Sequence, residues 1–288
     1  MKKNLAVMAV AALALAACEK NVLETEGTVT NPVMNDRQQV VLTFSPYETE
    51  PMTRGAATRA AQSVAGIAQR LDVWLYEDGA EVTAVHQAKG DDGFGTLTLT
   101  LDRRKTYTLY ALAHRSAEAT TLEDGIARWK DEKVTHTFYC TETFTPAETT
   151  ALDCTMHRIV GNFQLDITDD IPAAVKTLRF EIPQTATRYD VTTQTNTNVT
   201  DRTTDISYGG TSATFNLYLL AQDDDTTPFD ITVTAIDAGG TTIQQRTFSA
   251  VPVQNNRRTI YRGAFFTDQP LTATFSADDW QQGDTVEF

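Results

Sequence analysis

The segment TLTLTL at residues 96–101 alternates threonine and leucine without a break. Side chains along a strand point alternately to opposite faces, so this pattern predicts a half-buried β-strand whose leucines face a core. The same period of two recurs in the runs 71–76, 107–113 and 159–167. Threonine, with 48 of 288 residues, is β-branched and half-polar, which suits a pleated surface with one face in water. The sequence therefore predicts an all-β protein.

Short strand-like runs separated by turn residues continue along the chain, a spacing typical of β-sandwiches. The length allows two sandwiches in series. We place the N-terminal β-sandwich at residues 37–155 and the C-terminal β-sandwich at residues 156–288.

The predicted N-terminal sandwich contains three further segments, the first of which is a strand with alternating Val40, Leu42 and Phe44. Gln38–Phe44 is interpreted as an edge strand, and it precedes the weakly patterned residues 45–66, a loop of a length that is often functional. One short helix is expected at Thr121–Lys130, where apolar residues recur at helical spacing.

The amino-terminal residues 1–17 have the pattern of an exported precursor, with two lysines and then an uncharged apolar run from residue 5 to 17. This run is too short to span a bilayer as a mature helix. It ends in Leu-Ala-Ala-Cys, which resembles a bacterial lipobox, where a signal peptidase cuts before an acylated cysteine. We therefore predict a signal peptide at residues 1–17, a lipidated Cys18 with two or three acyl chains, and a polar tether at residues 18–36.

The charge balance argues against a nucleic-acid partner. The formal net charge is −14. Without residues 1–17, which hold two lysines and no acid, 22 basic residues stand against 38 acidic ones, a net charge of −16. A surface this negative repels phosphate backbones.

No motif for catalysis or cofactor binding emerges from the sequence. The four histidines, His86, His114, His136 and His157, lack metal-ligand spacing and are expected to be surface or strand residues. There is neither a G-x-S-x-G nucleophile elbow nor a Gly-Lys-Ser/Thr phosphate loop. We expect no enzymatic activity, no cofactor and no metal.

Two cysteines besides Cys18 are compatible with a disulfide. Cys140 and Cys154 each lie in a β-like run, and an exported chain meets an oxidising compartment. They could face each other across a hairpin as a disulfide, or be two small core residues. The sequence leaves both alternatives open.

Several stretches spread over nearly the full length carry a resemblance to a known family. They are the lipobox at Cys18, Thr58–Ala60, Leu71–Gly79, Tyr107–Ala113, Met156–Phe163, Val251–Gly263 and Trp280. The most telling is the run Asn-Arg-Arg-Thr-Ile-Tyr-Arg-Gly at residues 256–263. With these features the chain resembles the Bacteroidales fimbrillin-like lipoproteins, the subunits and anchors of type V pili.

The resemblance implies two tandem transthyretin-like β-sandwich domains and assembly into a fimbrium by β-strand exchange. In stalk and tip members, a trypsin-like protease cuts after an arginine and removes an N-terminal strand. That role would fall on Arg54 or Arg59, which could equally be ordinary surface arginines. Anchor members keep this segment and their lipid.

The resemblance also implies a partner and a location. The length and the opening of the second sandwich favour an anchor or a minor, accessory subunit. Its partners would be other fimbrial subunits, joined by donor-strand insertion, and its role would be to support adhesion. It would lie at the outer membrane through its lipid anchor, exposed at the cell surface.

A second class of function is also compatible with the sequence. A surface glycan-binding lipoprotein of a polysaccharide-uptake system would likewise be acylated, acidic and built of β-sandwiches. Such a protein should show several aromatic side chains in loops, whereas tryptophan and tyrosine fall mostly in strand-like runs here.

The lipobox leads to a direct test. Cys18→Ala should release the protein from the membrane fraction or leave an unprocessed precursor, because the cysteine is both the cleavage site and the predicted sole attachment. Fractionation of cells with detergent partitioning measures this. Unchanged partitioning of the variant would contradict the prediction.

Overall fold

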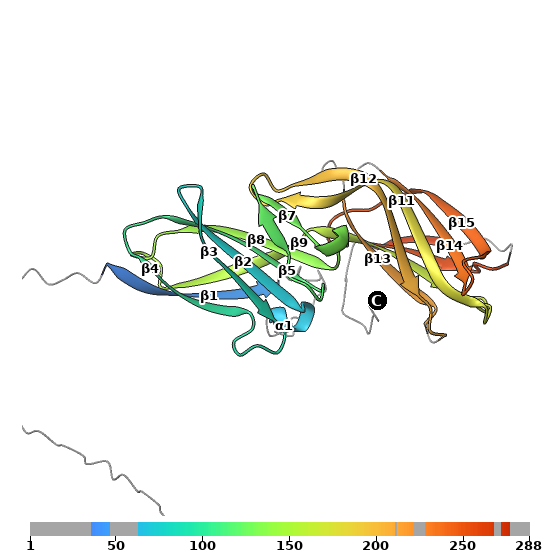
Figure 1. The fold of residues 1–288 in the computed structure, drawn as a ribbon, viewed down its shortest axis with the longest axis horizontal. Coiled ribbons are helices and arrows are strands. Elements are labelled where there is room, and N and C mark those ends of the chain that lie inside the picture. Colours follow the sequence, from blue (N-terminus) through green and yellow to red (C-terminus); the bar gives the residue numbers. More distant parts are fainter. Residues whose placement is uncertain (1–35, 47–62, 211, 222–227, 268–271, 277–288) are drawn as a thin grey trace, which may run out of the picture. The chain divides into compact units, whose positions relative to one another are not determined.

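The computed structural model describes residues 36–46, 63–210, 212–221, 228–267 and 272–276, which form an almost entirely β protein (Figure 1). The strands fall into two sheets, so the all-β prediction is confirmed. Within the described residues, the helical segments are one α-helical turn, α1 (Val64–Ile67), and one 3-10 turn, η1 (Lys130–Glu132). The described residues belong to one compact unit that begins at Asp36.

The first sheet has seven strands in the order β3-β2-β5-β8-β9-β1-β4. Their bounds are β1 (Arg37–Pro46), β2 (Arg70–Glu77), β3 (Ala80–Ala88), β4 (Thr96–Asp102), β5 (Tyr107–His114), β8 (Thr137–Phe144) and β9 (Ala151–Arg158). Strands β8 and β9 pair through two residue pairs near Tyr139. Side chains of β2, β5 and β8 share one apolar core with those of β1, β4 and β9. The sheet therefore folds over at the β8–β9 joint into a sandwich.

The alternating threonine–leucine segment at residues 96–101 lies in strand β4. Its Leu101 is buried in the first core, and Leu97 and Leu99 pack against that core while partly exposed. The threonines between them lie on the other face, so the half-buried strand is confirmed.

The second sheet contains ten strands among the described residues. The main path runs β15-β14-β11-β13-β10-β16-β17, with β12 and β7 paired to β11 and β6 paired to β7. The bounds are β6 (Thr121–Glu123), β7 (Ile126–Arg128), β10 (Val160–Ile167), β11 (Val175–Asp190), β12 (Thr195–Ser207), β13 (Thr214–Leu220), β14 (Phe229–Asp237), β15 (Thr242–Val251), β16 (Arg258–Gly263) and β17 (Thr272–Ser276). A second apolar core fills this sheet, rich in phenylalanine from β10, β11, β13, β14 and β15.

The two sheets repeat one strand topology. In the first, β1 pairs antiparallel with β4 and parallel with β9. In the second, β10 pairs antiparallel with β13 and parallel with β16. The hairpin β2–β3 and the pairs β2–β5 and β5–β8 likewise correspond to β11–β12, β11–β14 and β14–β15. The same Greek-key-like arrangement therefore occurs twice in the chain.

A third apolar cluster joins side chains of both sheets. Trp74 and Tyr139 contribute from the first sheet, and Tyr189 and Tyr218 from the second. The Tyr139 hydroxyl donates a hydrogen bond to the Val191 carbonyl at 2.6 Å. Trp74 is only 2% exposed, so its ring is a packing residue, although its neighbours on the same face of β2 are polar.

The helix expected at Thr121–Lys130 is wrong, because this segment forms the hairpin β6–β7. Asp124 and Gly125 both have positive φ at its turn, 50° and 77°. An Asp-Gly pair in this conformation makes the two-residue turn that matches the twist of a hairpin. The turn chemistry therefore prevails over the helical spacing of three apolar residues.

The predicted boundary between residues 155 and 156 lies inside β9, which pairs with the first sheet through its last residue, Arg158. In addition, β7 precedes that boundary in sequence and pairs with β11 of the second sheet. The division of the chain into two domains stays a prediction.

Gly161 in β10 tests how tightly the second sheet is packed. A Cβ atom there would lie 2.6 Å from both the Gln254 carbonyl oxygen and a Val253 methyl. Gly161→Ala should therefore lower the free energy of unfolding by about 1–3 kcal/mol, the usual cost of overpacking. Urea denaturation measures this. Gly209→Ala is the matched control, since a Cβ at Gly209 meets nothing within 4 Å; an equal effect of both variants would contradict the prediction.

Candidate functional site: strand β1 and its groove

Strand β1 is an inner strand of the first sheet, so its interpretation as an edge strand is wrong. It runs antiparallel to β4, with Gln39 opposite Thr100, and parallel to β9, with Phe44 opposite Cys154. The parallel partner comes from a segment 110 residues further along the chain. A period of two shows that a strand is half-buried, but it does not show how many neighbours the strand has.

The side chains of β1 alternate between core and solvent as the sequence predicts. Val40, Leu42 and Phe44 are at most 2% exposed and belong to the first core. Val41 and Thr43 between them are exposed. Burial of three such apolar side chains stabilises the fold by about 2 kcal/mol each.

The backbone of β1 is hydrogen-bonded on both sides. The Phe44 N–H donates to the Gly95 carbonyl at 2.9 Å, and the Val41 N–H donates to the Thr150 carbonyl at 3.0 Å. Without β1, the facing backbone groups of β4 and β9 would lose their partners, and the core would open between them. The place of β1 is therefore a groove that fits one extended strand of defined direction.

Three predicted site residues lie outside the described residues. Arg54 and Arg59 fall in residues 47–62, between the end of β1 and Ser63, and Cys18 falls in residues 1–35. Proteolytic processing and lipidation stay predictions.

The two predicted disulfide partners lie together in the first core. Cys140 on β8 and Cys154 on β9 are both buried, and both are free thiols in this structure. A hydrogen bond with Cys140, together with burial, raises the pKa of the Cys154 thiol above its ordinary value. The two thiols lie together in the buried core, and a disulfide between them stays a prediction.

A buried polar cluster, which we call the Asp72 cluster, was missed by the sequence analysis. It comprises Asp72 on β2, His86 on β3, His114 on β5 and Thr120. Asp72 Oδ2 accepts hydrogen bonds from Thr120 N–H at 2.7 Å and Thr120 Oγ1 at 2.6 Å. His114 Nε2 lies 2.8 Å from the same oxygen, and His86 Nδ1 lies 2.8 Å from Oδ1.

The hydrogen bonds of His114 assign its tautomer. Its Nδ1 accepts a hydrogen bond from the Ser116 backbone N–H at 3.2 Å. The proton of the neutral ring is therefore on Nε2, where it is donated to Asp72. Both carboxylate oxygens of Asp72 therefore have a hydrogen-bond partner within the cluster.

Two of the four histidines are more buried than the sequence predicted. His114 and His136 are buried, and His136 stacks on Tyr218 at a ring-centroid distance of 5.3 Å. Burial and the nearby guanidinium of Arg158 lower the pKa of His136 well below its ordinary value. Within the described residues, no three or more His, Cys, Asp or Glu side chains are grouped to hold a metal ion.

This architecture defines an all-β protein of two sandwich-like sheets with one shared topology, in which β1 and β10 each lie between two later strands. The chain belongs to a protein family of unknown function (DUF6562), whose model matches residues 32–285. No curated protein matches the chain in sequence.

Solved structures from Bacteroides species share the fold. One is a proposed cell adhesion protein from Bacteroides uniformis, 14% identical, with a TM-score of 0.52 over 86% of this chain and 100% of its own. Another proposed cell adhesion protein, from Bacteroides ovatus, is 12% identical, with a TM-score of 0.51 over 86% of this chain and 99% of its own. At this identity the likeness concerns the fold. No helix among the described residues has the length and apolarity to cross a membrane.

The Asp72 cluster makes stability depend on pH. Burial raises the pKa of Asp72, but the hydrogen bonds from His114 and Thr120 bring it below its ordinary value of 3.8. Because the folded-state pKa lies below the unfolded one, the carboxylate stabilises the fold at pH values above 3.8. This contribution is lost as the pH falls through the folded-state pKa.

Asp72→Asn should accordingly lower the free energy of unfolding by about 1–3 kcal/mol at neutral pH, because buried donors lose a charged acceptor. The difference from the parent chain should shrink as the pH falls below 4. Urea denaturation of both proteins from pH 7 to pH 3 measures it. Asp153→Asn on the exposed face of β9 is the control and should have little effect; a cost of Asp72→Asn that is constant with pH would contradict the assignment.

Proposed function

We propose that this protein is a structural subunit of cell-surface fimbriae, assembled by β-strand exchange and supporting adhesion, in an anchor or minor, accessory position. The observation that carries the proposal is the place of β1, an inner strand near the amino terminus of the described chain. Residues 47–62, which follow it directly, contain the two arginines at which a trypsin-like protease could act. The shared fold with proposed cell adhesion proteins agrees with this function.

Loss of β1 would create a groove that requires filling. The edges of β4 and β9 would expose unpaired N–H and C=O groups, and the first core would be open to water. An incoming strand must run parallel to β9 and antiparallel to β4, with apolar residues at every second position. Removal of β1 and binding of a partner strand are therefore coupled.

The chain itself contains a segment with this pattern at β17. Residues 271–276 read Leu-Thr-Ala-Thr-Phe-Ser, and residues 40–45 read Val-Val-Leu-Thr-Phe-Ser. Leu271, Ala273 and Phe275 thus recur at the spacing of Val40, Leu42 and Phe44. Among the described strands, β17 pairs with β16 alone. A β17-like strand of a neighbouring subunit would therefore suit the groove.

The state of the N-terminal segment would set the position in the fibre. A chain that keeps β1 has a filled groove and can only end a fibre, as an anchor does. With Cys18 acylated, that end would be held at the outer membrane. A chain cut after Arg54 or Arg59 would instead accept a donor strand. In either position the role proposed here is structural, without catalysis, cofactor or nucleic acid.

The exchange can be tested with a peptide of residues 268–278. After limited trypsin treatment that cuts at Arg54 or Arg59, the protein should release the β1 segment and capture this peptide, whereas the uncut protein should not. Mass spectrometry of the cut protein and fluorescence anisotropy of a labelled peptide measure the two events. An Arg54→Gln, Arg59→Gln variant should resist the cut and bind no peptide.

A peptide with Thr274 and Phe275 exchanged is the matched control. Its composition is unchanged, but the aromatic ring moves to the solvent face of the strand. It should therefore bind much more weakly. Equal capture of both peptides, or a cut protein that retains β1 and captures neither, would refute strand exchange in this chain.

A further inference from the structure

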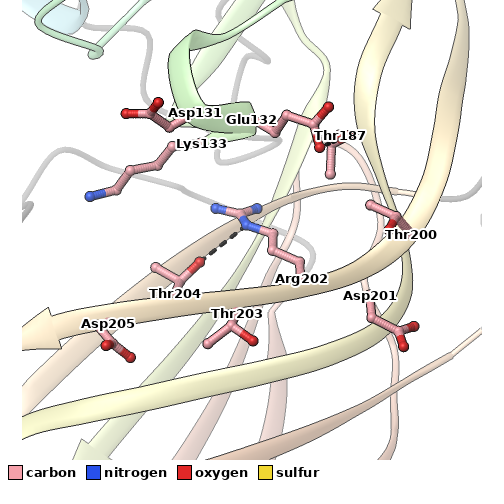
Figure 2. Close-up of a pocket in the computed structure, with 10 residues that line it drawn as sticks. All are labelled: Asp131, Glu132, Lys133, Thr187, Thr200, Asp201, Arg202, Thr203, Thr204 and Asp205. Carbon is pink, nitrogen blue, oxygen red and sulfur yellow. Dashed lines mark hydrogen bonds between the residues drawn. The ribbon is translucent and has the colours of Figure 1, made fainter.

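A polar cavity of about 300 Å³ opens beside β12 in the second sheet (Figure 2). We call it the Arg202 pocket. Its walls come from β12, from Thr187 on β11, and from the turn Asp131–Lys133 that follows β7. It is made entirely of described residues, and its volume is at the small end of the range of ligand sites.

Two irregularities of the backbone shape the pocket. The pairing of β11 with β12 shifts register between Ile182 and Thr185, so a bulge lies opposite the stretch Thr200–Arg202. Bulges re-aim side chains and recur beside functional sites. On the facing wall, Asp131 and Glu132 have φ values of 53° and 54°, in the left-handed region that non-glycine residues rarely adopt.

The guanidinium of Arg202 lies in this pocket and forms no ion pair with a carboxylate of the described residues. Arg202 is 8% exposed, and burial lowers its pKa to about 10. Its Nε donates to Thr204 Oγ1 at 3.1 Å, and its two Nη atoms donate to backbone carbonyls, those of Tyr218 at 2.9 Å and Val134 at 3.3 Å. A guanidinium has five N–H donors, so two are left after these three bonds.

The carboxylates around the pocket do not neutralise Arg202. Asp201 and Asp205 project from the opposite side of β12 (Figure 2), as alternation along a strand requires. Asp205 forms a two-bond ion pair with Arg179 at 2.8 and 2.9 Å. Glu132 is bound to Arg188 at 2.6 Å.

The remaining side chains at the cavity are a cation, an acid and hydroxyl groups. Lys133 and Asp131 are both exposed at its rim (Figure 2). Thr187, Thr200 and Thr204 add hydroxyl groups, and no aromatic or aliphatic side chain lines the cavity. This lining favours a polar ligand over a lipid or an aromatic one, and a ligand with an anionic group and several hydroxyl groups would find a partner for each.

We propose that the Arg202 pocket binds a sugar residue that carries a carboxylate, such as a uronic or sialic acid unit of a glycan. The two spare N–H donors of Arg202 would bind the carboxylate, with Lys133 at the rim as a second cation. The threonine hydroxyls and the Asp131 carboxylate would bind the sugar hydroxyls. The pocket lies outside the β1 groove, so this inference is independent of strand exchange.

Saturation-transfer NMR and titration calorimetry on the purified full chain, with β1 uncut, test the proposal. The probes are methyl β-glucuronide and the methyl glycoside of N-acetylneuraminic acid, with methyl β-glucoside as the neutral counterpart. The acidic sugars should bind at least about tenfold more tightly than the glucoside, because the charge-assisted bonds to Arg202 are absent from the neutral sugar.

Substitutions separate binding from folding. Arg202→Lys keeps the charge but loses the planar fork, and Lys133→Ala removes the rim cation; each should weaken binding of the acidic sugars by about tenfold. Lys130→Ala, in the same turn but outside the cavity, is the matched control and should bind like the parent chain. If Arg202→Lys unfolds the protein, Lys133→Ala carries the test, because Lys133 is exposed.

Three results would overturn the proposal. They are equal binding of glucuronide and glucoside, absence of binding by both acidic sugars, and acidic-sugar binding that Lys133→Ala leaves unchanged. Failure of sugar binding together with successful capture of the donor peptide would reject this pocket and leave the proposed fimbrial function standing.

Discussion

Each sheet contains one long-range parallel pair, which joins β1 to β9 in the first sheet and β10 to β16 in the second. β1 and β10 each also have an antiparallel partner on the other side. Parallel strands cannot be joined by a tight turn, so this partner always comes from far along the chain. The remaining pairings in both sheets are antiparallel. The inserted strand is thus the element on which closure of each core depends.

That dependence is the basis of the proposed exchange of β1. The strand donates and accepts hydrogen bonds along both edges and buries only one face. In the proposed exchange, a strand of the same direction and alternation would replace those interactions, because backbone hydrogen bonds carry no sequence information and the side-chain positions require apolar groups of suitable size. β10 has the same topological place, but residues on both sides of it in sequence are paired strands, β9 and β11. Of these two strands, β1 alone has no described strand before it in sequence.

The sequence was most informative where local chemistry decides the structure. The period of two located β1, β2, β4, β5 and β10, because alternation is a property of each strand by itself. It could not show that β1 is an inner strand or that Asp72 meets His114, since these facts depend on partners 42 to 110 residues away. The pair Asp124-Gly125 is typical of a hairpin turn, but the prediction for residues 121–130 followed the helical spacing of the apolar residues there. No sequence pattern distinguished Arg202 as a binding residue, because it lies alone in a run rich in threonine.

The two buried charges illustrate how a structural group can be told from a binding group. Asp72 accepts hydrogen bonds from Thr120 and has a histidine nitrogen at each carboxylate oxygen, so its site is closed. Arg202 is also buried, yet its hydrogen-bond acceptors among the described residues are neutral, and it lines a cavity. A buried charge without a counter-charge is costly to maintain. An anionic group in the cavity would offset that cost.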